Sequence, residues 1–413
     1  MLDAVTHRDA GSIDHQGPST PTVKGTNMDK RLLVLALGMF AIGTDGFVMA
    51  GVLPELANSF HVSIGTAGQV TTAYALSYAL LAPTVAAIGG NMPRKMLLLL
   101  GLTVFVIANL ATAAAPSFGF AIVMRVLTGL GAAMFAPTAS GAGVLLVPVH
   151  RRGFALSVII GGLTTATALG SPMGSVIGAL GDWRWTMIFV SGLGSLAFLG
   201  VTVLLSNIPT PPALGLAKRL APLRDSRVVM TLMTTLLSMD GFFTVYTYFS
   251  VVFDRAINGS PLVFGALLVV WGAAGTFGNL FTGRLVDCLG VRKVLLTVLT
   301  LAAVDMVSFA WTGASLWTAA AAIVIWGAFS WSVQAPQQSR LVSLQPTLAP
   351  VVLGLNNTDT YLGVASAGII GALGIQTVGA HNLGIVGALL VLFALAACEF
   401  ATWRITPVAV ATV

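Results

Sequence analysis

Charged side chains are scarce in this sequence. They make up 8% of its 413 residues, whereas hydrophobic residues make up 56%. A soluble globular chain carries roughly 25% charged residues, so this chain has too little polar surface to face water on all sides. Its mean hydropathy of +0.92 excludes an ordinary soluble protein and indicates a surface that largely faces lipid.

Cysteine and histidine are also rare. Cys288 and Cys398 cannot build a disulfide framework, so helix packing must hold the fold. The five histidines are scattered and show no metal-ligand spacing. The sequence has no Gly-x-x-x-x-Gly-Lys-Ser/Thr phosphate loop, no hydrolase elbow and no haem motif. We therefore expect no enzymatic activity, no metal and no cofactor, and no direct use of ATP.

Twelve stretches are apolar over about the 20 residues that a spanning helix needs. They cover residues 32–54, 64–88, 95–115, 118–146, 154–178, 184–206, 228–252, 261–283, 292–313, 316–339, 350–376 and 380–403. This pattern predicts an all-α membrane protein of twelve transmembrane helices in two six-helix bundles, 31–206 and 228–404, joined by a cytoplasmic linker, 207–227. Residues 1–30 are polar and lack the apolar core of a signal peptide, so we expect a disordered cytoplasmic tail there and a short one at 405–413.

Basic residues are distributed unevenly over the loops. With the N-terminus inside, all 20 lysines and arginines except Arg125, Arg184 and Arg255 fall on cytoplasmic segments. The positive-inside rule therefore predicts that both termini are cytoplasmic. The same distribution accounts for the net charge of +6 without a nucleic-acid partner.

The two halves of the sequence repeat each other. The echoes are Asp45-Gly46-Phe47 with Asp240-Gly241-Phe242, Arg94-Lys95 with Arg292-Lys293, and Ala136-Pro137 with Ala335-Pro336. Their offsets are nearly constant, at 195 (240 − 45), 198 (292 − 94) and 199 (335 − 136) residues. Two six-helix repeats with a central site near the membrane midplane are typical of transporters.

Several motifs resemble the major facilitator superfamily. The segment 283–293 resembles its loop signature, 125–131 its fourth-helix motif, and 170–178 with Trp183-Arg184 the fifth-helix motif of proton-driven antiporters. Segments 52–57 and 355–358 resemble the bacterial branch of arabinose, purine nucleoside and chloramphenicol exporters. The resemblance implies alternating access in the bacterial inner membrane, with gating residues Arg94, Lys95, Arg284, Asp287, Arg292, Gly170, Pro172 and Gly174.

The chain departs from the family pattern in two places. The loop 89–95 lacks the usual aspartate, which puts acid-dependent gating of the first half in doubt. Many relatives carry an acid where this chain has Gly46, so Asp45 is rotated by about 100° from that position on the helix.

Charges inside a bilayer cost at least ~2.5 kcal/mol and usually serve a function. Asp45 and Arg125 fall at similar depths in helices that the family fold places around the central cavity. We predict that Asp45 carries the proton and that Arg125 is its electrostatic partner. The alternative is a buried pair that only fixes the helix register.

Asp240 lies at the equivalent depth in the second half, and we assign it both to proton coupling and to the substrate. It shares a helix face with Phe243, Thr244, Thr247 and Tyr248, which suits a cationic or amphipathic substrate. An interhelical hydrogen-bonding stripe is the alternative. Other polar positions predicted to bind the substrate are Tyr74, Tyr78, Trp326, Gln334, Gln338, Asn356 and Asp359, whereas Asp305 is expected to form local hydrogen bonds.

These observations together predict a monomeric transporter that exports a small organic molecule, a drug or a metabolite, and is driven by the proton gradient. Two alternatives stay open. One is a proton-coupled uptake symporter on the same fold. The other is a membrane receptor or scaffold that transports nothing.

Overall fold

The computed structural model describes residues 30–410 except 90–91, 149–150, 207 and 209–214. Within these residues all regular secondary structure is helical. Eleven helical stretches are long and apolar enough to cross a membrane. The predicted tail, apart from Lys30, and part of the predicted linker lie outside the described residues.

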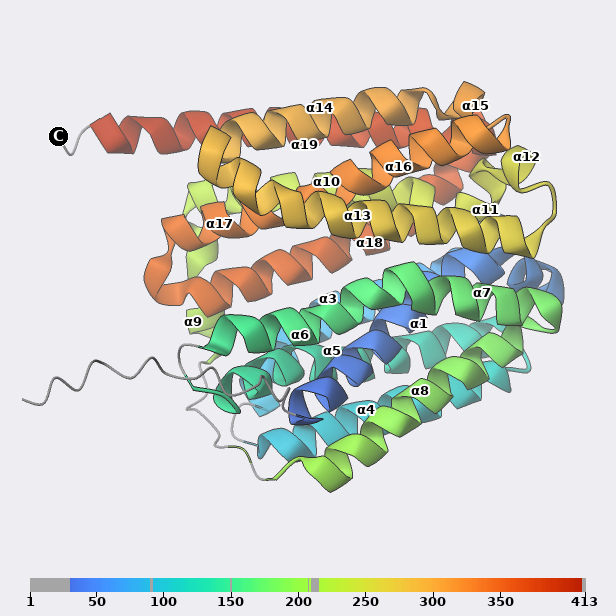
Figure 1. The fold of residues 1–413 in the computed structure, drawn as a ribbon, viewed down its shortest axis with the longest axis horizontal. Helices are drawn as coiled ribbons and strands as arrows, with labels where there is room; N and C mark the ends of the chain where they lie inside the picture. Colours follow the sequence, from blue (N-terminus) through green and yellow to red (C-terminus); the bar gives the residue numbers. More distant parts are fainter. Residues whose placement is uncertain (1–29, 90–91, 149–150, 207, 209–214, 411–413) are drawn as a thin grey trace, which may run out of the picture.

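The described part of the first half contains six helical stretches long and apolar enough to cross a membrane, and Figure 1 shows how they lie together. Its elements are α1 (Lys30–Phe60), α2 (Ile64–Ala67), α3 (Gln69–Ile88), α4 (Arg94–Ala113), α5 (Phe118–Leu145), α6 (Arg152–Thr165), the π-helical turn η3 (Ala166–Gly170), α7 (Ser171–Leu180) and α8 (Trp183–Leu204). The π-helical turn directly precedes Ser171-Pro172, where the proline cannot donate a helical hydrogen bond.

The second half follows two short helices, α9 (Leu216–Leu220) and η4 (Ala221–Arg224). Its elements are α10 (Ser226–Thr247), α11 (Phe249–Val252), α12 (Asp254–Ile257), α13 (Pro261–Leu289), α14 (Val291–Val307), α15 (Phe309–Thr312), α16 (Leu316–Ser332), α17 (Gln334–Leu344), η5 (Pro346–Leu348), α18 (Ala349–Val378), η6 (Ala380–Asn382) and α19 (Leu383–Val410). Asp225 caps α10, and hydrogen bonds from Arg227 hold the pKa of its carboxyl below the usual range.

Some predicted boundaries were wrong. The first span was expected to end at Pro54, but α1 continues to Phe60 because Val52, Leu53, Leu56 and Ala57 on both sides of the proline are buried. The ninth span keeps close to its predicted range, but it is interrupted at Ser308, which separates the 17-residue α14 from α15. The last helix runs to Val410, into the segment predicted as a tail.

Helices α1–α8 form one group and α10–α19 the other (Figure 1). In the first group α1 packs on α6 and α8, and α4 packs on α5 and α8. In the second, α10 packs on α18 and α19, and α13 packs on α16. We call the face at which α1 begins the N-terminal face and the face at which it ends the far face.

The two groups touch along α3 with α18 and along α7 with α13. Towards the far face, Gln69 Nε2 donates to the Gly368 carbonyl at 3.2 Å, and Thr72 Oγ1 donates to the Ala365 carbonyl at 3.1 Å. Tyr248 Oη, in the second half, donates to the Gly65 carbonyl of the first half at 3.4 Å and to the Gly368 carbonyl of its own half at 2.6 Å. These contacts join the halves on the far-face side of the bundle.

Close packing of α4 on α5 gives a test of the fold. A Cβ atom at Gly131 would lie 2.7 Å from the Gly101 carbonyl oxygen and from the Phe105 backbone nitrogen, neither of which can rotate away. We expect Gly131→Ala to destabilise the protein by about 1–3 kcal/mol through overpacking. Gly141→Ala, in the same helix with no atom within 4 Å, is the matched control. Thermal unfolding in detergent should show a lower Tm for the first variant alone, and equal Tm values would contradict this packing.

Candidate functional site

The structure brings Asp45 on α1 and Arg125 on α5 together. Arg125 Nη1 donates to both carboxylate oxygens of Asp45, at 2.7 and 2.9 Å. Both side chains are buried, with exposed fractions of 1% for Arg125 and 0% for Asp45. A pair removed from water in this way depends on each partner for charge balance. The geometry allows a role in proton coupling, and that role stays a prediction.

Polar atoms without partners surround this ion pair. Arg125 Nη2, Tyr74 Oη and Asn109 Oδ1 are buried and lack a hydrogen-bond partner among the described residues. The Arg125 guanidinium lies over the Tyr74 ring, 4.6 Å from its centroid, and its Nε donates to the Val70 carbonyl at 3.4 Å. The pair therefore has unused hydrogen-bonding capacity, which a water molecule or a polar solute could satisfy.

Three tyrosines connect the surroundings of the ion pair with the second half. Tyr74 and Tyr78 on α3 face Tyr361 on α18, and we call this group the tyrosine bridge. Its ring centroids are 6.4 Å apart for Tyr74 with Tyr361 and 3.8 Å for the stacked Tyr78 with Tyr361. Asn357 Nδ2 donates to Tyr78 Oη at 3.0 Å. The ion pair is thus one aromatic ring away from the opposite half.

A second cross-half contact is aromatic. Phe47, two residues after Asp45, lies among four rings of the second half, which we call the aromatic box. Its centroid lies 6.1 Å from Phe243, 5.8 Å from Tyr246, 6.4 Å from Trp271 and 5.9 Å from Trp331. Tyr246 Oη also donates to the Phe47 carbonyl at 3.1 Å. Rings from both halves therefore meet close to the ion pair.

Asp240 differs from its repeat-related partner Asp45. It is 3% exposed and has no ion-pair partner in the described part of the chain, where its Oδ1 also lacks a hydrogen bond. Ser366 on α18 is its polar neighbour. The Thr244 and Thr247 hydroxyls on the same helix are buried and likewise unpartnered within the described residues. Phe243 belongs to the aromatic box, so this face of α10 combines apolar rings with unused polar atoms.

An amide network links three helices of the second half. Asn356 on α18 accepts from Thr235 Oγ1 at 2.8 Å and donates to Gln334 Oε1 at 3.3 Å. Gln334 Nε2 contacts Thr360 Oγ1 at 3.3 Å, and Gln337 Nε2 donates to the Thr231 carbonyl at 2.8 Å. Asn356 and Gln334 were predicted site residues, and both use part of their hydrogen-bonding capacity within this network.

Two predicted substrate contacts were wrong in direction, and a third stays a prediction. Tyr248 leaves the face of Asp240 because α10 ends at Thr247, and its hydroxyl donates to the Gly65 carbonyl of the first half near the far face instead. Trp326 is buried behind the aromatic box, with its ring 5.6 Å from Trp271 and 6.5 Å from Tyr246, so its role as a substrate contact stays a prediction. Gln338 is exposed and Gln337 is buried, because the helix is interrupted at Val333 ahead of Pro336, which shifts the inward-facing positions.

Two further acids lie on helices of the second half. Asp359 on α18 is half-buried, and no hydrogen bond of its carboxylate is found among the described residues. Asp305 on α14 is 8% exposed, and its Oδ2 has no partner within that same part of the chain. The local hydrogen bond that we expected for the Asp305 side chain is therefore absent at Oδ2.

The predicted gating residues fall into two groups. On the N-terminal face, Lys95 Nζ donates to the Thr202 carbonyl at 2.9 Å, close to the half-buried Arg94, and Arg292 forms an ion pair with Glu399 at 2.5 Å. Arg284 and Asp287 are exposed and form no ion pair with another described residue. The resemblance did not identify Glu399 as the partner of Arg292.

The second group is the fifth-helix motif, which packs on α1. A Cβ atom at Gly170 would lie 2.0 Å from Thr44 Oγ1, and one at Gly174 would lie 2.7 Å from Val48 Cγ2. Pro172, between them, is buried. The two glycines therefore allow η3 and α7 to approach the helix that carries Asp45, whereas a hinge function stays a prediction.

Sequence reasoning missed the residues that reach across the two halves. Tyr361, Asn357 and Tyr246 were not assigned to the site, although each is a polar residue within an apolar span. Asn109 and Gln337, which are also polar residues within apolar spans, were not assigned to the site either. Polarity within a span was the available signal, but it does not identify the partner helix.

Comparisons with known proteins agree with this architecture. The sequence profile described as Major Facilitator Superfamily matches residues 35–368. The inner membrane transport protein YdhP of Escherichia coli (strain K12) is 31% identical over 83% of this chain and 89% of its own length. A probable sugar efflux transporter of Helicobacter pylori (strain P12) is 26% identical over 90% of this chain and 95% of its own.

Solved structures share the fold at low sequence identity. A D-xylose-proton symporter aligns with a TM-score of 0.74 at 17% identity, covering 90% of this chain and 96% of its own. A bacterial homologue of the human lysosomal transporter Spinster, in an inward-facing and unoccupied conformation, aligns with a TM-score of 0.68 at 16% identity. The alignment covers 91% of this chain and 98% of the homologue.

The buried ion pair can be tested through its coupling energy. Asp45→Asn and Arg125→Gln should each lower the free energy of unfolding by about 3–5 kcal/mol, because each leaves a buried partner unbalanced. The double variant should lose less than the sum of the two. Arg184→Gln, in the exposed pair with Asp182, is the control and should change stability by less than about 1 kcal/mol. Strictly additive losses in thermal unfolding would contradict the pairing.

Proposed function

The chain belongs to the Major Facilitator Superfamily and is a membrane transporter, and from that premise we propose that it exports a small organic molecule in exchange for protons. One observation supports this proposal above the others. The Asp45–Arg125 ion pair is buried, and the tyrosine bridge connects it directly with the second half. A change of charge at this position therefore acts where the two halves meet.

The proposed proton step involves Asp45. A proton that binds its carboxylate removes the negative charge that balances Arg125. The guanidinium then loses its strongest partner in a region where Nη2 already lacks one among the described residues. The free energy of the closed arrangement rises, and the population shifts towards a conformation in which solvent or the solute can reach Arg125.

The proposed substrate region lies between the ion pair and Asp240. The aromatic box supplies apolar surface around Phe47, and Asp240, Thr244 and Thr247 supply polar atoms without partners among the described residues. Apolar walls with a few polar groups are typical of sites for small organic molecules. The name of the Helicobacter pylori relative supports sugars as one substrate class to test.

We place the transporter in the bacterial inner membrane with its N-terminal face in the cytoplasm. Arg94, Lys95, Arg151, Arg152 and Arg292 lie at helix ends on that face, as the positive-inside rule requires for a cytoplasmic surface. In this orientation the cross-half contacts near the far face close the periplasmic side, and export requires them to break. The proposal needs one chain, the proton gradient and no cofactor.

Transport in proteoliposomes tests the coupling and its direction. Vesicles are loaded with labelled monosaccharides or nucleosides, and acid is added outside. Proton exchange should drive the solute out faster than at equal pH, and Asp45→Asn should lose this acceleration. An uptake symporter would instead move solute inwards under the same gradient. Solute movement that ignores the gradient in the unaltered protein would overturn proton coupling altogether.

The native cysteines test the orientation without a new probe. Cys288 is exposed near the end of α13 on the N-terminal face, and Cys398 is buried. A membrane-impermeant maleimide should label the protein in inverted vesicles but not in intact spheroplasts. Cys288→Ser should abolish the labelling and thereby identify the site. Labelling in spheroplasts would place the N-terminal face outside.

A further inference from the structure

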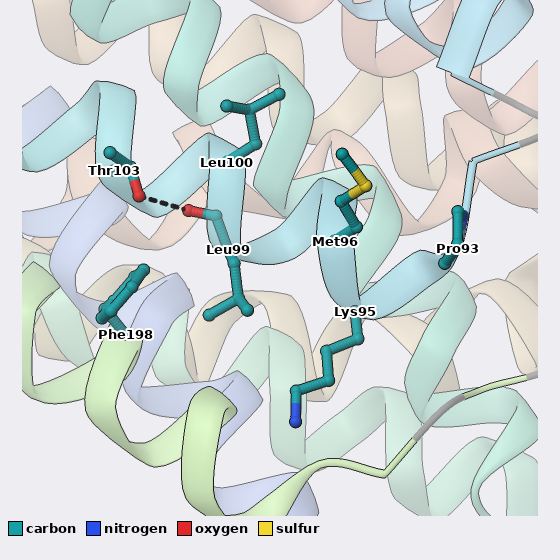
Figure 2. Close-up of a pocket in the computed structure, with 7 residues that line it drawn as sticks. All are labelled: Pro93, Lys95, Met96, Leu99, Leu100, Thr103 and Phe198. Atoms are coloured by element: carbon teal, nitrogen blue, oxygen red, sulfur yellow. Dashed lines mark hydrogen bonds between the residues drawn. The ribbon is translucent and has the colours of Figure 1, made fainter.

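A groove opens on the outer side of the first bundle, between α4 and α8 near the N-terminal face (Figure 2). It has a volume of about 520 Å³, and its lining is apolar except for Lys95 and Thr103. The lining residues are Pro93, Lys95, Met96, Leu99, Leu100, Thr103 and Phe198. The groove extends along α4 for about 15 Å, since ten residues separate Pro93 from Thr103 at 1.5 Å each.

The groove has a cationic end and an apolar body. Lys95 lies at the N-terminal-face end and uses its ammonium group to donate to the Thr202 carbonyl. An ammonium group has three donors, so further donors are available for a second acceptor. Met96 is 54% exposed and Leu100 is 41% exposed, as expected for apolar side chains on a surface that faces lipid. This order of charge and apolar surface matches a phospholipid with an anionic headgroup.

No acid of the described first half balances the charge at this end. Within the described part of the first half, the acidic residues are Asp45, Glu55 and Asp182. Asp45 is buried in the ion pair, and Glu55 and Asp182 lie towards the far face. Arg94 neighbours Lys95 in sequence and lies close enough to Arg219 for mutual repulsion. The N-terminal face of the first bundle is therefore positively charged where the groove begins.

The second half handles the equivalent charges differently. Arg292 and Lys293 occupy the repeat-related positions at the start of α14. Arg292 forms an ion pair with Glu399 on α19, with contacts at 2.5 and 3.1 Å. In the second half, Glu399 thus pairs with one of the two basic residues. The described first half has no carboxylate on this face, so an anion from outside the protein can pair with its basic residues.

We propose that an anionic phospholipid binds in the α4–α8 groove, with its phosphate at Lys95 and an acyl chain along Met96, Leu100 and Phe198. Anionic lipids of the leaflet attract basic residues next to the membrane, and this attraction adds to burial of the chain in the groove. The bound lipid bridges the ends of α4 and α8 on the N-terminal face. The site is independent of the direction of transport and of the Asp45–Arg125 pair.

Native mass spectrometry of the detergent-purified protein tests the headgroup. Phosphatidylglycerol should bind more tightly than phosphatidylcholine with the same acyl chains. Lys95→Gln should weaken phosphatidylglycerol binding by about fivefold, the effect of one basic contact to an anionic membrane lipid. Lys293→Gln, at the repeat-related position, should leave it unchanged. Equal losses in both variants, or equal binding of both lipids, would overturn the proposal.

A second pair of measurements tests the acyl chain and keeps the proposal falsifiable if Lys95→Gln folds poorly. Leu100→Trp fills the groove from its lipid-facing side and should lower phosphatidylglycerol binding while leaving the headgroup end intact. Inorganic phosphate and glycerol phosphate should not raise the Tm of the protein, whereas phosphatidylglycerol should. A Tm rise with phosphate alone, or full lipid binding by Leu100→Trp, would show that no lipid occupies the groove.

Discussion

A carboxylate and a guanidinium held together in the buried interior of the first bundle are the constraint on which the rest of this molecule depends. Asp45 and Arg125 can remain charged there because each balances the other at 2.7 Å. The close approach of η3 and α7 to α1 through Gly170 and Gly174, and of α4 to α5 through Gly131, holds the helices that carry the pair. Packing by small residues thus fixes the distance between two charges.

The position of the pair gives it influence beyond its own bundle. Arg125 lies on Tyr74, Tyr74 faces Tyr361, and Tyr361 belongs to the second half. Phe47, on the same helix as Asp45, enters the aromatic box of the second half. The aromatic side chains at these contacts are uncharged. The two halves can therefore separate here without breaking an ion pair among these residues. The buried ion pair therefore lies within one bundle, whereas aromatic contacts and hydrogen bonds of uncharged groups join the two halves.

Much of this could be predicted from sequence because membrane helices obey strong rules. Apolar length predicts the spans, and the similar depths of Asp45 and Arg125 predict that the two side chains meet. Side-chain direction was harder to predict. Pro54 was expected to end a helix, but α1 continues past it because the residues on both sides are buried. The interruption of the helix ahead of Pro336 makes Gln337, and not Gln338, the buried residue. Cross-half partners such as Tyr361 and Asn357 depend on the docking of two bundles, which periodicity within one helix does not encode.

The two halves share the arrangement of their helices, but they differ in which charged residues have a partner. Asp45 and Asp240 occupy matching positions, yet only the first has a cation beside it within the described residues. Arg292 has Glu399, whereas Arg94 and Lys95 have no acid on their face of the described first half. Each mismatch leaves an uncompensated group where the other half has a pair. In a low-dielectric surrounding such a group needs a partner from outside the protein. Asp240 lies beside the proposed substrate region and Lys95 lies beside lipid, so their missing partners are of different kinds, a proton or solute for the first and a membrane anion for the second.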